Sequence, residues 1–255
     1  MLQEVENRTN KDQQSEPVLN QEKIKKAGPT LAMWKRGVLL ALGIIGMNLI
    51  AFLLSFIYRG FPRIDRSVAV NLLTYSLLVI LMLTVIMLDI PKFLFQFKSW
   101  KPYVFAIAFA VGMNLFNAFY TTIVDLFYPI KAATSGNETG IREIIKAQPV
   151  ASLFIIGIIG PLCEELAYRV GLFGLLKRVN RVLAYIVAAL VFGFLHFDFQ
   201  STDIVREFVF LPTYVVPGVL FCLAYDLFGL PCSWTAHAMN NVTAVLLQIA
   251  GNLTE

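Results

Sequence analysis

Two acidic residues and an arginine stand inside an apolar stretch, in the run Pro161-Leu-Cys-Glu-Glu-Leu-Ala-Tyr-Arg169. Glu165 and Arg169 are four positions apart, so on a helix they share a face, with the acid before the base as an ion pair prefers. Glu164 is rotated by about 100° and has no partner on its own helix. Ionisable groups at bilayer depth are costly, which makes each of them a functional candidate. A carboxylate without a partner can act as a general base and take a proton from water.

The two histidines of the chain stand in two later apolar stretches. His196 ends the run Phe192-Gly-Phe-Leu-His, and His237 begins the run His-Ala-Met-Asn-Asn241, whose first and last residues share a helix face. At 1.5 Å per residue from the expected cytoplasmic helix ends, the depths are about 18 Å for Glu164, 21 Å for His196, 10 Å for His237 and 16 Å for Asn241. Residues of one site would share a layer in this way. The sequence therefore predicts one site built from three helices.

The elements that position these residues are expected to be membrane-spanning helices. The chain is 57% hydrophobic and 15% charged, whereas soluble domains carry about 25% charged residues. A helix needs about 20 apolar residues to cross a bilayer, and seven segments come near or above this length. They lie at about 37–58, 67–90, 102–129, 149–176, 182–200, 207–228 and 231–250. The predicted fold class is an all-α polytopic membrane bundle of about seven transmembrane helices, or eight with a re-entrant segment.

The organisation along the chain is a tail followed by one membrane domain. Residues 1–34 are polar and are predicted to form a disordered cytoplasmic tail. Residues 35–255 form the transmembrane domain, with the catalytic core at about 149–250. Pro212 and Pro217 should kink the sixth segment, and Gly229 to Pro231 should form a tight turn before the seventh.

Loop charges predict the orientation. With the N-terminus inside, the cytoplasmic side carries 13 Lys and Arg and the other side carries 7, which favours a cytoplasmic N-terminus. No basic face alternates with aromatic residues, so a nucleic-acid partner is not expected. The three cysteines lie in or beside apolar stretches and are expected to be small, inert core residues rather than a disulfide framework; they are Cys163, Cys222 and Cys232.

The three motifs together resemble a known family. Glu-Glu-x-x-x-Arg, then Phe-x-x-x-His, then His-x-x-x-Asn on successive apolar helices are similar to the CPBP (CAAX protease and bacteriocin-processing) intramembrane endopeptidases, relatives of the type II CAAX prenyl protease. The resemblance covers about residues 149–250 and includes Trp234 before His237. The first three helices and the tail give no such support. The resemblance implies proteolysis of a membrane-associated peptide or protein inside the lipid bilayer.

The resemblance also implies a role for each motif residue. Glu164 would be the general base that activates a water, and His196 would help to hold that water. His237 and Asn241 would stabilise the oxyanion of the tetrahedral intermediate. The supporting pair that orients the motif helix would be Glu165 and Arg169.

Cofactor use is left open by the residue types. Two histidines and a glutamate, namely Glu164, His196 and His237, would also make a zinc ligand set with one position open for water. Metal-free glutamate chemistry is favoured, because Asn241 suits an oxyanion hole better than a zinc shell. In either case water must reach the site, so we expect a hydrated cavity that opens toward the cytoplasm.

Two other functions fit the same composition. A non-catalytic membrane partner of the same family, with a bacteriocin-immunity or regulatory role, would make Glu164 and His196 dispensable. An ion-coupled transporter also places acids and histidines at mid-membrane, but the chain shows no repeat of the transporter kind. The intact set of motif residues favours the endopeptidase.

Overall fold

The computed structural model describes residues 31–127 and 135–252, and every regular element within these ranges is a helix. In chain order the helices are α2 (Met33–Ala41), η1 (Leu42–Gly46), α3 (Met47–Ile57), α4 (Arg63–Val85), η2 (Met87–Asp89), α5 (Ile90–Gln96), α6 (Lys101–Phe127), α7 (Gly136–Ala147), α8 (Pro149–Phe154), η3 (Ile155–Ile159), α9 (Gly160–Glu164), η4 (Glu165–Phe173), α10 (Gly174–Leu176), α11 (Arg181–Leu195), α12 (Ile204–Phe210), α13 (Pro212–Phe228) and α14 (Leu230–Asn252). The segments η1, η3 and η4 are π-helical. Residues 1–30 of the predicted tail lie outside the described residues.

Within residues 31–127 and 135–252, five helices are long and apolar enough to cross a membrane, and they cover 33–57, 66–85, 101–127, 149–176 and 204–228. Helix α11 is shorter, with 15 residues, and α14 has 23 residues but is not among the five. Large apolar side chains face outward along α3 and α6, including Phe52, Phe56 and Phe119. In a bilayer such side chains contact lipid rather than water. The prediction of an all-α membrane bundle is confirmed, and the chain is an integral membrane protein.

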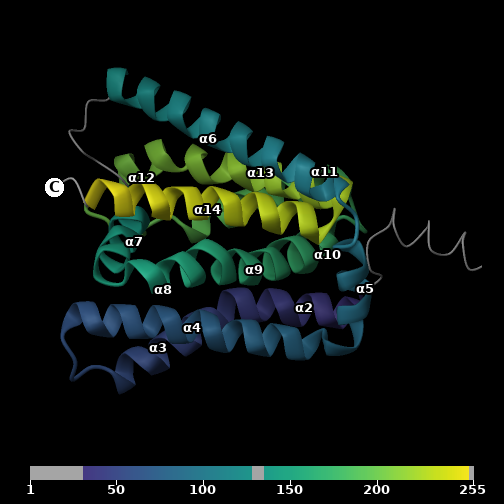
Figure 1. Cartoon of the computed structure of the whole chain (residues 1–255), viewed down its shortest axis with the longest axis horizontal. Coiled ribbons are helices and arrows are strands. Elements are labelled where there is room, and N and C mark those ends of the chain that lie inside the picture. The colour runs from purple at the N-terminus through teal and green to yellow at the C-terminus, as the bar shows by residue number, and fades with distance from the viewer. Residues whose placement is uncertain (1–30, 128–134, 253–255) are drawn as a thin grey trace, which may run out of the picture.

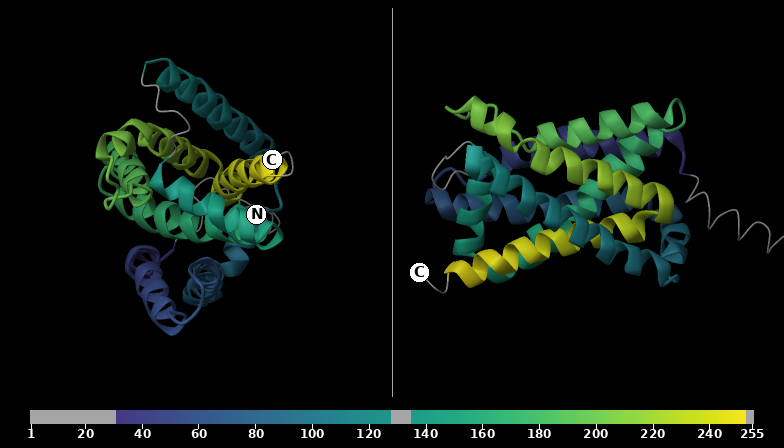
Figure 2. Two further views of the ribbon diagram at one scale, coloured as in Figure 1. Left: turned by 90° about the vertical axis from the view of Figure 1, so that its left-hand side faces the viewer. Right: turned by 90° about the horizontal axis from the view of Figure 1, so that it is seen from above.

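The continuous helix from α8 to α10 occupies the middle of the bundle. It packs against α2 and α4 on one side and against α11, α13 and α14 on the other. The end-on view places α6 on one side of the bundle and α3 with α4 on the opposite side (Figure 2). The helix that carries the two glutamates therefore contacts most of the elements that could complete a site.

The connections gather at two ends of the bundle (Figure 1). One end carries α5, the start of α11 and the turn from α13 to α14, and the other carries α7 and α12. At the α5 end, Asp226 forms ion pairs with Lys177 and Arg181. The α13–α14 turn depends on Gly229, whose φ of 77° lies in the region that favours glycine. This turn is where the sequence predicted it.

Two predicted boundaries are corrected by the structure. Helix α11 ends at Leu195 instead of about residue 200, so His196 is its C-cap and does not lie inside a helix. The polar run that follows favours a turn, and Asp203 caps α12 by accepting a hydrogen bond from the Arg206 amide at 3.0 Å. The sixth segment is divided at Leu211 between α12 and α13, because Pro212 cannot continue the hydrogen bonding of a helix interior.

Candidate active site

The central helix changes from α-helical to π-helical between Glu164 and Glu165. Glu165 and Arg169 are both fully buried, and the Glu165 Oε2 lies 3.5 Å from the Arg169 Nε. The guanidinium also lies over two rings, 4.7 Å from the Phe192 centroid and 5.4 Å from that of Phe221. The predicted ion pair is therefore part of the core. π-Helical segments inside α-helices are frequent at functional sites.

His237 lies between the two glutamates. Its Nδ1 is 3.0 Å from the Glu165 Oε1, and its Nε2 is 3.7 Å from the Glu164 Oε2. The ring stacks on Phe221 with centroids 4.2 Å apart. The Tyr75 hydroxyl donates to the Glu164 Oε1 at 3.4 Å. Glu164 is therefore not isolated as its position on the helix suggested, because both acids contact the same imidazole. Glu165, Arg169 and His237 are referred to below as the charged cluster.

His196 has different surroundings. It is half-buried, its Nδ1 lies 2.8 Å from the Phe192 carbonyl, and its ring stacks on Tyr214 with centroids 4.7 Å apart. A carbonyl oxygen only accepts, so this contact assigns the proton to Nδ1 and leaves Nε2 as an acceptor. The Phe192 ring contacts both imidazoles, with its centroid 4.7 Å from that of His196 and 5.7 Å from that of His237.

Asn241 is held against the central helix. Its Nδ2 donates to the Ile156 carbonyl at 3.2 Å, and the Trp234 Nε1 donates to the Ile158 carbonyl at 3.1 Å. Both carbonyls belong to the π-helical segment η3. The two helices come this close because Gly157 faces α14: a Cβ at this position would lie 2.9 Å from the Val242 Cγ2.

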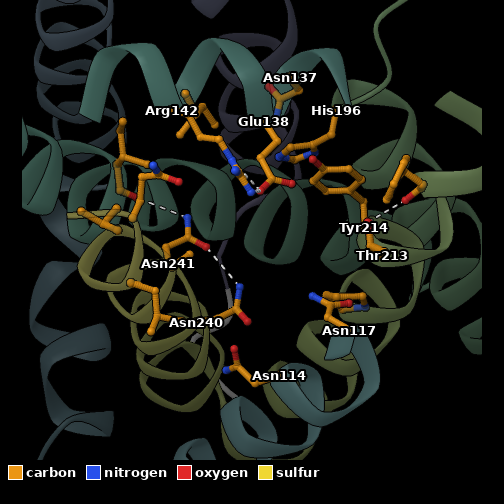
Figure 3. Close-up of a pocket in the computed structure, with 18 of the residues that line it drawn as sticks. Asn114, Asn117, Asn137, Glu138, Arg142, His196, Thr213, Tyr214, Asn240 and Asn241 are labelled. Atoms are coloured by element: carbon orange, nitrogen blue, oxygen red, sulfur yellow. Dashed lines mark hydrogen bonds and ion pairs between the residues drawn. The ribbon is translucent and has the colours of Figure 1, made fainter. Parts of the chain in front are cut away.

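A cavity of about 930 Å³ lies beside these residues, and His196, His237 and Asn241 all line it. Figure 3 shows its polar side chains, with His196 beside Tyr214 and with Asn240 next to Asn241. The two glutamates of the motif do not line the cavity. They lie next to it through His237, which contacts both of them.

The cavity occupies one half of the bundle. Most of its lining comes from the second half of α6, α7, the first half of α13, and α14 from His237 onward, so it lies toward the end that carries α7 and α12 (Figure 1). A cytoplasmic N-terminus would make this the outer half. An opening toward the cytoplasm would need the opposite orientation, and it stays a prediction. Polar residues of α6 and α7 line this part of the cavity. None of them belongs to the three motifs, so the motifs alone did not indicate where the cavity lies.

Several lining residues were not predicted from the sequence. Asn114 and Asn117 are three positions apart in the third apolar segment. Two polar residues on one face of an apolar helix could have indicated them from the sequence. Glu138 and Arg142 form an ion pair at 2.6 Å on α7, which lies between predicted segments. Tyr214 is an ordinary aromatic residue in the sequence, and only its stacking on His196 singles it out.

The predicted zinc ligands do not come together. Glu164 contacts His237, whereas no contact of His196 with either of these two residues is seen among the described residues, and His196 packs on Phe192 and Tyr214. In the described part of the chain no group of three His, Cys, Asp or Glu side chains could hold a metal ion. The three cysteines are buried and free of disulfides, as predicted.

Comparisons with known proteins place this region in a family. Residues 146–243 match the model of the "Type II CAAX prenyl endopeptidase Rce1-like" family. The chain is 39% identical over 80 residues to the membrane-embedded CAAX protease MroQ of Staphylococcus aureus, and this match covers 29% of each chain. It is 28% identical over 119 residues to the putative membrane peptidase YdiL of Bacillus subtilis, covering 45% of this chain and 44% of the relative.

A protein of Mycoplasma capricolum without an assigned function is 33% identical over 153 residues, covering 56% of this chain and 42% of the relative. The chain thus spans less than half the length of these curated relatives. No solved structure matches the chain. The matched region includes all three motifs and the charged cluster, and over this region the chain is similar to the Rce1-like CAAX endopeptidases of the CPBP family.

Proposed function

We propose that the protein is an intramembrane endopeptidase that cleaves a membrane-associated peptide or protein with a water activated by Glu164. The observation that carries the proposal is the position of His237. It is held between two carboxylates and forms part of the wall of a polar cavity that His196 and Asn241 also line.

The reaction begins with the activation of water. Glu164 takes a proton from the water, and the oxygen attacks the carbonyl carbon of the scissile peptide bond. The Glu164 side chain is 13% exposed, and its carboxylate has Tyr75 and His237 as polar neighbours. His196 contributes by accepting a hydrogen bond at its free Nε2. When the intermediate collapses, Glu164 returns the proton to the leaving amine.

The oxyanion needs donors that are already oriented. One Nδ2 hydrogen of Asn241 bonds the Ile156 carbonyl, and the other remains for the oxyanion. Glu165 fixes the Nδ1 side of His237, so donation to the oxyanion requires a second proton on Nε2. Arg169 pairs with the Glu165 Oε2 and His237 with its Oε1, which makes the charged cluster a support for this histidine.

The orientation is part of the proposal. The excess of Lys and Arg in the tail and in the loops at the α5 end favours a cytoplasmic N-terminus. With this orientation the cavity lies in the outer half of the bilayer, and the substrate would be cut there. Cysteine labelling with a membrane-impermeant reagent at position 143 on α7 tests this side.

The deciding experiment is an assay of the full-length protein in detergent on a fluorogenic library of membrane-proximal peptides. Glu164→Gln should lower cleavage by about 10²- to 10⁴-fold, the usual contribution of a general base, and leave thermal unfolding unchanged. The matched control is Glu143→Gln, because Glu143 is an exposed carboxylate on α7. Retained cleavage in Glu164→Gln would contradict the proposal.

A strong zinc chelator separates the two chemistries. Cleavage that survives the chelator but is lost in Glu164→Gln supports glutamate catalysis. Cleavage that is lost both with the chelator and in Glu164→Gln would make the protein a metalloprotease that depends on Glu164. A folded wild type that cleaves no peptide, together with a phenotype that survives Glu164→Gln, would favour the non-catalytic membrane partner.

A further inference from the structure

Four asparagines from two neighbouring helices line the cavity, and the proposed chemistry uses only Asn241. Asn114 and Asn117 lie on α6, and Asn240 and Asn241 lie on α14. The two helices pack against each other, and Figure 3 shows the four carboxamides around the same part of the cavity. Asn114, Asn117 and Asn240 therefore have no assigned function, and neither have the other two lining carboxamides, Asn137 of α7 and Gln248 of α14.

These side chains have unused hydrogen-bonding capacity. The Oδ1 of Asn117 is buried and has no hydrogen-bond partner among the described residues. The Nδ2 of Asn114 donates to the Ala110 carbonyl at 2.8 Å, and that of Asn240 donates to the Asn241 Oδ1 at 3.4 Å. These contacts leave the Oδ1 of both residues for a ligand. An unpaired polar group in apolar surroundings is costly, so a partner is expected in the cavity.

A carboxamide offers the same groups as a peptide bond, one carbonyl acceptor and N–H donors. A row of them matches the main chain of an extended peptide and is indifferent to side-chain charge. Three charged side chains line the cavity, namely the Glu138–Arg142 ion pair and Asp125. A cavity of about 930 Å³ is large enough for several residues of an extended chain, which rises about 3.3 Å per residue.

We propose that Asn114, Asn117 and Asn240 form an amide clamp that binds the main chain of an extended peptide substrate. This inference rests on the proposed function. Asn240 directly precedes Asn241 on α14, so a peptide held by the clamp would pass next to the oxyanion site. The clamp supplies affinity for the main chain, and the apolar walls of the cavity are left to select side chains.

The test measures binding separately from cleavage, in the full-length Glu164→Gln protein. The probe is a labelled pool of short random-sequence peptides, and the comparison is the same pool methylated on every main-chain nitrogen. Fluorescence anisotropy gives the dissociation constants. Asn117→Ala and Asn240→Ala should each weaken binding of the unmodified pool by about three- to tenfold, the cost of one lost hydrogen bond. The methylated pool should bind more weakly than the unmodified one.

The matched control is Asn48→Ala. The Asn48 Nδ2 donates to the carbonyl four residues earlier at 2.6 Å, as that of Asn114 does, but Asn48 does not line the cavity. This variant should bind as the parent protein does. If Asn117→Ala unfolds on heating earlier than the parent, Asn240→Ala decides the result.

The outcomes separate the two proposals. Equal binding by the parent and the asparagine variants, equal binding of both pools, or no binding to the folded parent would each overturn the clamp. Peptide binding that depends on the asparagines, in a protein whose wild type cleaves nothing, would reject the endopeptidase and keep the clamp.

Discussion

The two histidines lie in contrasting surroundings, although both contact the Phe192 ring. His237 belongs to the charged cluster, which is buried and held by charges: Glu165 on one side, Glu164 on the other and Arg169 behind Glu165. His196 stands at a helix end on the open cavity, held by a main-chain carbonyl and by stacking on Tyr214. The first region has almost no contact with solvent, and the second is open to it.

This difference suggests a division of labour. Buried charges fix one another strongly but are costly to unbalance, so the charged cluster suits the precise positioning of His237. Neutral contacts leave His196 free to exchange hydrogen bonds with water and substrate. Changes in the charged cluster should therefore affect folding and activity together, whereas changes in the cavity should affect activity alone.

The largest effect is expected for Arg169→Met. The change leaves Glu165 buried without its cation, which typically costs about 3–5 kcal/mol, and cleavage should be lost with the fold. Thermal unfolding in detergent measures this effect. Arg142→Met is the matched control, because the Arg142–Glu138 pair is about half exposed and should contribute at most about 0.5 kcal/mol. Equal loss in both variants would remove the distinction between the regions.

The second effect is on activity alone. His196→Asn should lower kcat by about 10²-fold or more, since an acceptor for the reacting water is lost, and should leave the unfolding temperature unchanged. His237→Asn should lower both kcat and the unfolding temperature. Steady-state kinetics with parallel unfolding curves tests the pair, and a strongly destabilised His196→Asn would contradict the comparison.

A smaller effect is expected where the cavity wall is tied together. Glu207 is buried and accepts hydrogen bonds from the Gly136 amide at 2.9 Å and the Asp198 amide at 3.2 Å. It thereby joins the start of α7 to the turn after His196. Glu207→Gln should cost about 1–3 kcal/mol in unfolding free energy. If the exposed control Glu143→Gln costs as much, this carboxylate does not hold the wall.

The smallest effect lies outside both regions, at Asp89. Lys35 and Lys92 donate to its carboxylate at 2.5 and 2.7 Å and hold the pKa of Asp89 below its usual value. The stability from this lowered pKa is present above the unfolded pKa of about 3.9 and is lost as pH falls through the folded pKa. Asp89→Asn should therefore unfold at a lower temperature than wild type at pH 6, by an amount that shrinks below about pH 4. A constant difference across this range would contradict the assignment.

The sequence by itself determined the fold class and the motif residues. Apolar segment length is a local property, and α8 to α10 at 149–176 match the predicted segment. The spacing of Glu165 and Arg169 was enough to predict their pairing, because the distance between residues on one helix depends on their separation in the chain. The turn at Gly229 was equally local.

Only the tertiary structure decided how the motifs meet. The contact of His237 with both glutamates depends on how α14 packs on the central helix, and no spacing within either helix encodes that. The end of α11 at Leu195 turned His196 from a helix-interior residue into a cap. Asn114, Asn117 and Tyr214 line the cavity but lie outside the motifs. Only their neighbours in the folded structure identify them as candidate site residues. Contacts between helices depend on side-chain fit over the whole bundle, which is why they had to be read from the structure.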